Sequence, residues 1–231
     1  MAASAKRLFG LPFHYWEAVL YNAVDLIFIG NYVGKSASAA VGSGSLLLTC
    51  LVGFITGISV GAGVVVAQYY GAKDYKNLQD SVHTAMSLAG IGGIVLTIAG
   101  LLLSPFILQW LRVPQEIFEL SVSYIRIYFI SILPMVLYNM GSAILRAYGD
   151  AKRPLIYLAS GAILNVFLDW LFVAVFSWGV AGASWATTIS QTLSAVLIVV
   201  HLFSTKREYR IHLKRLRIHK KQMMRIVKLG V

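Results

Sequence analysis

Three apolar stretches of the sequence carry oxygen-bearing side chains in positions where a helix would otherwise be hydrophobic throughout. Asp25 lies in "YNAVDLIFIG", and Asn165 and Asp169 lie in "LNVFLDWLFVAVF". A third stretch, "GASWATTISQTLS", carries the neighbouring pair Thr187 and Thr188. An aspartate at the centre of a membrane helix costs roughly 2.5–3.5 kcal/mol to insert. Two such acids therefore call for protonation, a charged partner or a bound cation.

Spacing places the helical pair on one face. Asn165 and Asp169 are four residues apart, so an amide oxygen and a carboxylate reach the same point on a helix surface. With Asp25 and one threonine hydroxyl they form an all-oxygen set, which suits a hard cation such as Na⁺ or a proton held by a carboxylate. A threonine in a helix can instead bond its own carbonyl one turn back. Arg126 is the candidate ion-pair partner for the acids.

Signatures of catalysis are missing from the sequence. It contains no Gly-Lys-Ser/Thr phosphate loop, no Cys/His set with metal-ligand spacing and no nucleophile with a base beside it. We therefore expect a protein that is not an enzyme and that needs no cofactor. The glycine-rich run "VGFITGISVGAG" (52–63) has Gly-x-x-x-Gly spacings, which predict close helix packing rather than a nucleotide loop.

The elements that must position these residues are membrane helices. The 231 residues are 58% hydrophobic and 13% charged, with a mean hydropathy of +0.74, whereas soluble domains are about 45–50% apolar and about 25% charged. A spanning helix needs about 20 mostly apolar residues. Six segments qualify, near residues 11–33, 44–70, 82–104, 117–145, 155–177 and 180–204. The fold prediction is an all-α protein with six transmembrane helices.

The basic residues predict the orientation of these helices. Of the 20 Lys and Arg residues, 17 fall in the N-terminus, the loops 71–80 and 146–154, and the tail, and two fall on the other side. Positive charge marks the cytoplasmic side, so both termini are predicted to be cytoplasmic. The basic tail, residues 205–231, has apolar residues at helical spacing and predicts an amphipathic helix on a membrane surface. Membrane lipids, and not nucleic acid, are the expected partners of these charges.

Several motifs together resemble the multidrug and toxic compound extrusion (MATE) transporters. They are "YNAVDLIFIGNYVG" with "AAVG", "GISVGAGVVVAQYYGAKD", "LYNMGSAILRAYGDAKRPL", "NVFLDWLFV" and "GVAGASWATTISQ", in family order across residues 20–231. The resemblance implies twelve helices in two six-helix lobes, of which this chain would be the N-terminal lobe (1–204) and a cytoplasmic linker (205–231) to a missing second lobe. Residues 1–18 do not resemble the family's first helix.

The resemblance also implies a function and a site. It implies an antiporter in the plasma membrane, the inner membrane in bacteria, that exports cationic or amphipathic drugs in exchange for H⁺ or Na⁺ by alternating access. The family's cation site maps onto Asp25, Asn165, Asp169 and Thr187, so the resemblance favours Thr187 over Thr188. With six helices the cleft needs a separate second lobe or a homodimer partner.

Two alternatives stay open at this point. One is a related flippase that moves lipid-linked sugars, which predicts a more cationic cavity than Arg126 alone provides within a membrane segment. The other is a lobe that transports nothing, either a truncated form or a membrane scaffold, because six helices supply half of a cleft. The sequence does not choose between H⁺ and Na⁺, since the same oxygens bind both.

Overall fold

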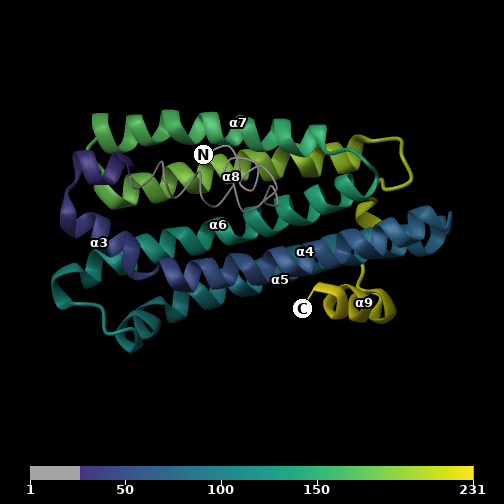
Figure 1. The fold of residues 1–231 in the computed structure, drawn as a ribbon, viewed down its shortest axis with the longest axis horizontal. Helices are drawn as coiled ribbons and strands as arrows, with labels where there is room; N and C mark the ends of the chain where they lie inside the picture. Colours follow the sequence, from purple (N-terminus) through teal and green to yellow (C-terminus); the bar gives the residue numbers. More distant parts are fainter. Residues whose placement is uncertain (1–26, 231) are drawn as a thin grey trace, which may run out of the picture.

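The computed structural model describes residues 27–230, and regular secondary structure within this range is helical throughout (Figure 1). Residues 27–32 form a helical segment. The elements that follow are α3 (Lys35–Ser43), α4 (Ser45–Gly71), α5 (Tyr75–Trp110), α6 (Gln115–Ala147), α7 (Lys152–Asp169), the π-helical turn η1 (Trp170–Val175), α8 (Gly179–Ser204), the 3₁₀ turn η2 (Leu213–Arg215) and α9 (Lys220–Gly230).

Within the described range, five helical segments are long and apolar enough to cross a membrane. They are Leu47–Gly71, Tyr75–Trp110, Gln115–Ala147, Lys152–Val175 and Gly179–Ser204. These correspond to the second through sixth predicted segments, with ends that differ by at most three residues except for Tyr75–Trp110, which is longer than predicted by seven residues at its start and six at its end. The predicted segment near 11–33 falls mainly outside the described residues, and Asp25 lies outside them altogether.

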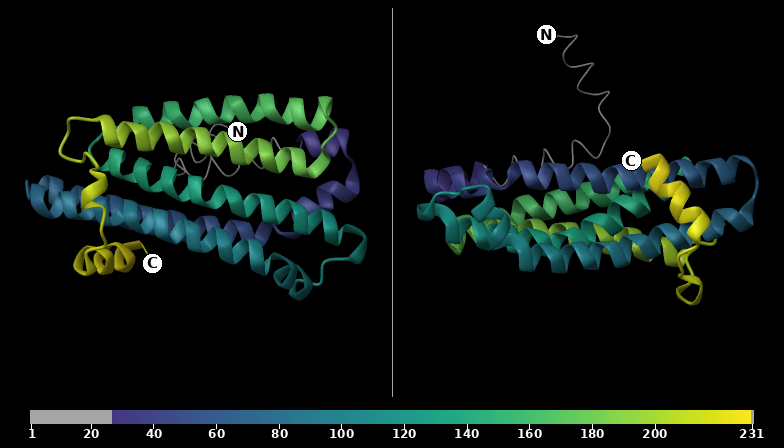
Figure 2. Two further views of the ribbon diagram at one scale, coloured as in Figure 1. Left: turned by 180° about the vertical axis from the view of Figure 1, so that it is seen from behind. Right: turned by 90° about the horizontal axis from the view of Figure 1, so that it is seen from below.

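Helix α6 is the central element of the bundle. It packs against α4 and α5 on one side and against α8 on the other, while α7 packs mainly against α8 (Figures 1 and 2). Burial follows this arrangement, because 56% of the most apolar stretch of α6 is buried, against 22% of that of α5. The peripheral helices keep apolar surface for lipid: Ile91, Ile94 and Ile98 of α5 are exposed at helical spacing.

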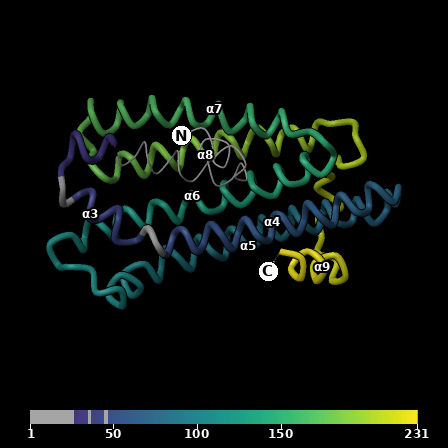
Figure 3. The backbone as a smooth tube through the Cα atoms, viewed as in Figure 1, coloured from purple at the N-terminus to yellow at the C-terminus, as the bar shows by residue number. Residues whose placement is uncertain are grey.

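The chain runs back and forth between two ends of the bundle (Figure 3). The turn from α4 to α5, the turn from α6 to α7 and the tail after α8 lie at one end, and the connections from α5 to α6 and from α7 to α8 lie at the other. Asp74 begins α5: its carboxylate accepts hydrogen bonds from the backbone N–H of Asn77 at 3.2 Å and from the Asn77 amide at 2.7 Å. The first of the two bonds is an N-cap, which satisfies an otherwise unpaired helix donor.

The stretch between the first two predicted spans contains a helix. The predicted spans leave residues 34–43 as the connection between them, and residues Lys35–Ser43 of this connection form α3. Its sequence, KSASAAVGS, is rich in Ala and Ser, which tolerate a helix but are not apolar enough to register as a span. Gly34, with φ of 110°, starts this helix by turning the chain through a conformation that favours glycine.

The basic tail is helical over a shorter range than the sequence predicted. After Ser204 the chain is irregular apart from η2, and helix resumes only at α9. Helix α9 packs on α4, where Ile226 is fully buried. The contact requires glycine, because a Cβ on Gly61 would overlap the carbonyl oxygen of Ile226. The Gly-x-x-x-Gly spacing of α4 therefore does mark close helix packing, and the partner is the tail.

Candidate functional site

Helices α7 and α8 bring three of the four sequence-predicted site residues into the interior of the bundle. Asn165 and Asp169 lie on α7 and Thr187 lies on α8, with exposed fractions of 1%, 0% and 2%. The Asn165 side chain donates a hydrogen bond from Nδ2 to Thr187 Oγ1 at 3.3 Å. This bond links the two helices directly. Because Nδ2 donates to Thr187, the amide oxygen Oδ1 of Asn165 points away from that hydroxyl. The fourth residue, Asp25, lies outside the described residues.

A change in helix type follows Asp169 immediately. The sequence predicted one helix over 155–177, but α7 ends at Asp169 and the chain continues as the π-helical turn η1. The wider turn closes with a hydrogen bond from the Phe176 N–H to the Leu171 carbonyl at 2.9 Å. Single π turns inside helices occur often at functional sites. Here the turn places the irregular part of the helix directly beside the buried carboxylate.

The two threonines of α8 have different partners. Thr188, 5% exposed, donates to the Ser184 carbonyl of its own helix at 2.8 Å and lies 3.4 Å from the Ile127 carbonyl of α6, with no hydrogen bond to the described residues of α7. Thr187 instead accepts from Asn165 across the helix interface. A hydroxyl that bonds its own helix is already committed to the backbone. The geometry therefore associates Thr187, and not Thr188, with the polar residues of α7.

The polar face of α8 extends beyond the residues that the sequence predicted. Ser190 and Gln191 are buried, and among the described residues neither Ser190 Oγ nor Gln191 Oε1 has a hydrogen-bond partner. Gln191 follows Thr187 by four residues, so helical spacing alone would have placed both on one face. Ser194 continues that face and donates to the Tyr157 carbonyl of α7 at 3.0 Å.

Arg126, the expected ion-pair partner, does not reach Asp169. Arg126 is exposed on α6, whereas Asp169 is fully buried. Among residues 27–230, Arg153 forms an ion pair with Asp150 and His219 Nε2 lies 3.5 Å from Asp80 Oδ1, and neither contact involves Arg126. The same range holds no group of three or more His, Cys, Asp or Glu side chains that would form a metal centre.

Inside this bundle of membrane-length helices, buried polar residues of α7 and α8 form a polar seam that comprises Asn165, Asp169, Thr187, Ser190 and Gln191. The family model MatE matches residues 13–171, which is more than half of the chain. The chain belongs to the MatE family. The family prediction from the sequence motifs is therefore confirmed, and the described helices are those of a multi-pass membrane protein of this family.

Curated MatE relatives are roughly twice as long as this chain. It is 33% identical over 189 residues to the probable multidrug resistance protein YpnP of Bacillus subtilis, covering 81% of this chain and 42% of that protein. It is 25% identical over 215 residues to the multidrug export protein MepA of Staphylococcus aureus strain MSSA476, covering 93% and 48%. The chain thus spans about half the length of the curated relatives it matches.

Solved MATE structures are also matched over about half of their length. A MATE structure in the bent conformation aligns with a TM-score of 0.87 at 27% identity, covering 93% of this chain and 48% of that one. An inward-facing multidrug resistance MATE family transporter of the MOP superfamily aligns with a TM-score of 0.85 at 28% identity, covering 91% and 48%. An outward-facing one also gives 0.85, at 27% identity, covering 94% and 48%.

Proposed function

We propose that this chain forms one lobe of a cation-coupled antiporter that exports drugs or other cationic or amphipathic compounds across the plasma membrane. The observation that carries the proposal is the complete burial of Asp169 beside the hydrogen-bonded pair Asn165 and Thr187. Relatives named as multidrug resistance and export proteins support the substrate class. Their sources, Bacillus and Staphylococcus, support a bacterial membrane.

The buried carboxylate supplies the coupling. Moving an ionised carboxylate out of water is costly, so a group such as Asp169 favours a bound proton or cation over bare charge. Asn165 and Thr187 add neutral oxygens, which Na⁺ would use and a proton would not need. Asp25, three residues after Asn22 in the family motif, completes the proposed site. The coupling ion is H⁺ or Na⁺, and it is cargo of the transport cycle rather than a resident cofactor.

The proposed cycle uses the charge state of this site to select the conformation. Asp169 and Asp25 bind the ion while the cleft faces outward, and neutralisation lets the helices that carry them repack. Substrate leaves, the lobes rock inward and the ion is released. One charge moving through 100 mV provides about 2.3 kcal/mol, equivalent to roughly a 50-fold gradient. Drug export at low stoichiometry is within that range.

Two features are consistent with a lobe that moves as a unit. The chain aligns equally well with inward-facing and outward-facing relatives, with a TM-score of 0.85 in both cases. Rocking of one repeat against another is the usual form of alternating access. The π-helical turn η1 gives the helix that bears Asp169 a local place to change without disturbing the core around α6. The cleft then requires a second lobe, from a second polypeptide or from a second copy of this chain.

Efflux of a fluorescent cationic dye tests the proposal. Cells would express the 231-residue chain alone and together with the second lobe of a full-length relative, and ethidium retention would be measured. We expect efflux when a complete cleft is present and its loss in Asp169→Asn. Glu119→Gln is the matched control, because Glu119 is an exposed carboxylate on α6. Unchanged efflux in Asp169→Asn, or no efflux under either condition, would overturn the proposal.

A further inference from the structure

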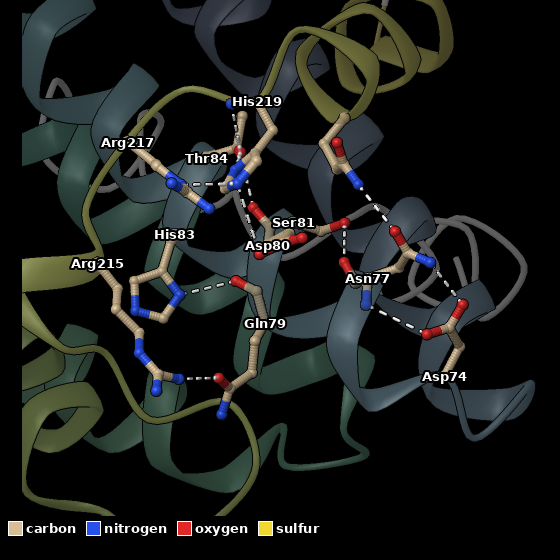
Figure 4. A network of polar contacts seen from close by, with 11 residues as sticks. Asp74, Asn77, Gln79, Asp80, Ser81, His83, Thr84, Arg215, Arg217 and His219 are labelled. Atoms are coloured by element: carbon tan, nitrogen blue, oxygen red, sulfur yellow. Dashed lines mark hydrogen bonds and ion pairs between the residues drawn. The ribbon is translucent and has the colours of Figure 1, made fainter.

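A cavity of about 340 Å³ lies between the first turns of α5 and the tail (Figure 4). This volume is within the range of small-ligand sites. Four cationic side chains line it: Lys76 from α5, and Lys214, Arg215 and Arg217 from the tail. The cavity lies at the end of the bundle away from the α5–α6 connection, and the buried seam between α7 and α8 contributes no residue to it.

Positive charge dominates this basic cavity. Asp80 is the carboxylate in its lining, and it lies 3.5 Å from His219 Nε2. None of the four cations takes part in an ion pair with another described residue. The nearby Asp74 carboxylate already accepts two hydrogen bonds from Asn77. The tail thus holds three cations over α5 without a matching set of carboxylates.

Both guanidinium groups are oriented by neutral partners. Arg215 donates from Nη1 to Gln79 Oε1 at 3.1 Å. Arg217 donates from Nε to His219 Nε2 at 2.9 Å. A guanidinium has five N–H donors in a planar fork, and each of these two uses one side-chain donor among the described residues. A guanidinium group held in one orientation can donate two parallel hydrogen bonds to the oxygens of a phosphate group.

His83 forms a wall of the cavity and fixes the tail. Its Nδ1 lies 2.7 Å from the Gln79 carbonyl, and its Nε2 accepts the backbone N–H of His212 at 3.1 Å. Both ring nitrogens are therefore occupied, and the bond to His212 sets the position of Lys214 and Arg215 just beyond it. The cationic residues are placed by the fold rather than gathered loosely on a surface.

The position of the cavity along α5 corresponds to lipid headgroups. The exposed apolar face of α5 begins at Ile91 and extends to Phe106. His83 is eight residues before Ile91, or about 12 Å along a helix. A bilayer adds polar headgroup layers outside a hydrocarbon core of about 30 Å, and basic pockets at that level bind anionic headgroups.

We propose that the basic cavity binds the phosphate group of an anion, with Arg215 and Arg217 as forked donors and Lys76 and Lys214 as additional charges. The bound anion bridges the tail to α5 and offsets the repulsion among the four cations. The phosphate comes from an anionic phospholipid or from a soluble phosphate compound. This site is independent of the proposed transport reaction, so a failure of either one leaves the other intact.

Binding of phosphatidylglycerol tests the site. The purified 231-residue chain in an uncharged detergent would be titrated with this lipid, and bound lipid counted by native mass spectrometry, with phosphatidylcholine of the same acyl chains as the neutral reference. Arg215→Gln with Arg217→Gln should weaken binding at least about tenfold, because charge-assisted hydrogen bonds are lost. The control pair Lys206→Gln with Arg207→Gln removes equal charge from exposed residues of the same tail outside the cavity.

Lys76→Gln separates ligand binding from tail docking. Lys76 makes no side-chain hydrogen bond to the other described residues, so its loss leaves the tail in place and should still weaken binding severalfold. A second arm measures whether millimolar inorganic phosphate raises the unfolding temperature more than chloride at equal ionic strength. Stabilisation by phosphate that the Arg variants lose assigns a soluble ligand, and lipid binding alone assigns the headgroup. Equal losses in the control pair, or full affinity in Lys76→Gln, would overturn the proposal.

Discussion

The polar residues that join α7 to α8 are buried in the bundle, whereas the cations of the basic cavity between α5 and the tail reach solvent. Asp169 is 0% exposed, and Asn165 bonds Thr187 next to it. Arg215 and Arg217 are exposed and are oriented by single hydrogen bonds. Both regions depend on contacts between segments distant in sequence, but only the first removes its charge-bearing group from water.

Burial decides what each region can do. A carboxylate inside the bundle is sensitive to protonation and ion binding, because its bare charge is costly there. Cations at the end of the bundle keep their hydration and attract anions through a field that salt weakens. We therefore assign ion coupling to the buried seam and anion binding to the cavity. The predictions that follow separate the two regions, beginning with the largest expected effect.

Matched substitutions at the neighbouring threonines test whether transport depends on the Asn165–Thr187 hydrogen bond between α7 and α8. Thr187→Val keeps the side-chain shape and removes the hydroxyl that accepts from Asn165. A buried donor left unpaired costs about 1–3 kcal/mol, so we expect dye efflux to fall roughly tenfold. Thr188→Val removes a hydroxyl that bonds its own helix at 2.8 Å and reaches the Ile127 carbonyl of α6 at 3.4 Å but makes no hydrogen bond to Asn165, and efflux should stay within about twofold of wild type. Equal losses at both positions would contradict the assignment.

Release of the tail should leave the seam unaffected. Gly61→Leu forces a side chain into the space that the Ile226 carbonyl occupies. Overpacking costs about 1–3 kcal/mol, so amide hydrogen-exchange protection of α9 should fall roughly 5- to 150-fold. Gly53→Leu is the control, because a Cβ there meets nothing within 4 Å. Loss of protection in α7 or α8 as well would show that the two regions are coupled.

The N-cap of α5 gives the smallest effect and depends on pH. Hydrogen bonds from the Asn77 side chain, and then from its backbone, lower the pKa of the Asp74 carboxyl. A lowered folded-state pKa adds stability above the unfolded-state value and loses it as the pH falls through the folded-state value. The difference in unfolding temperature between wild type and Asp74→Ala should therefore shrink below about pH 4. A difference that stays constant to lower pH would exclude this cap as its source.

The sequence predicted those features that depend on neighbouring residues. Apolar runs placed four of the five described spans within three residues of their ends and the fifth, Tyr75–Trp110, within seven, because hydropathy and helix length are local properties. The period of the helix put Asn165 and Asp169 on one face, and both are buried in α7. The same period places Gln191 four residues after Thr187 on one face of α8, a relation that the sequence prediction did not use.

Contacts between segments distant in sequence could not be predicted from local patterns. The partner of the glycine face of α4 is α9, more than 150 residues away, and composition alone does not select it. The tail is held beside the basic cavity by the hydrogen bond from the His212 backbone N–H to His83 Nε2. No local pattern predicts that bond. The helical type of α3 and the π turn after Asp169 depend on packing around residues whose own propensities are unremarkable.

Dye transport driven by an imposed ion gradient tests the central claim most directly. The chain and a second lobe would be reconstituted into lipid vesicles, and an H⁺ or a Na⁺ gradient applied in turn. We predict that wild type and Glu119→Gln move dye in response to at least one gradient, and that Asp169→Asn responds to neither. Transport by Asp169→Asn at the wild-type rate under the same gradient would contradict the account.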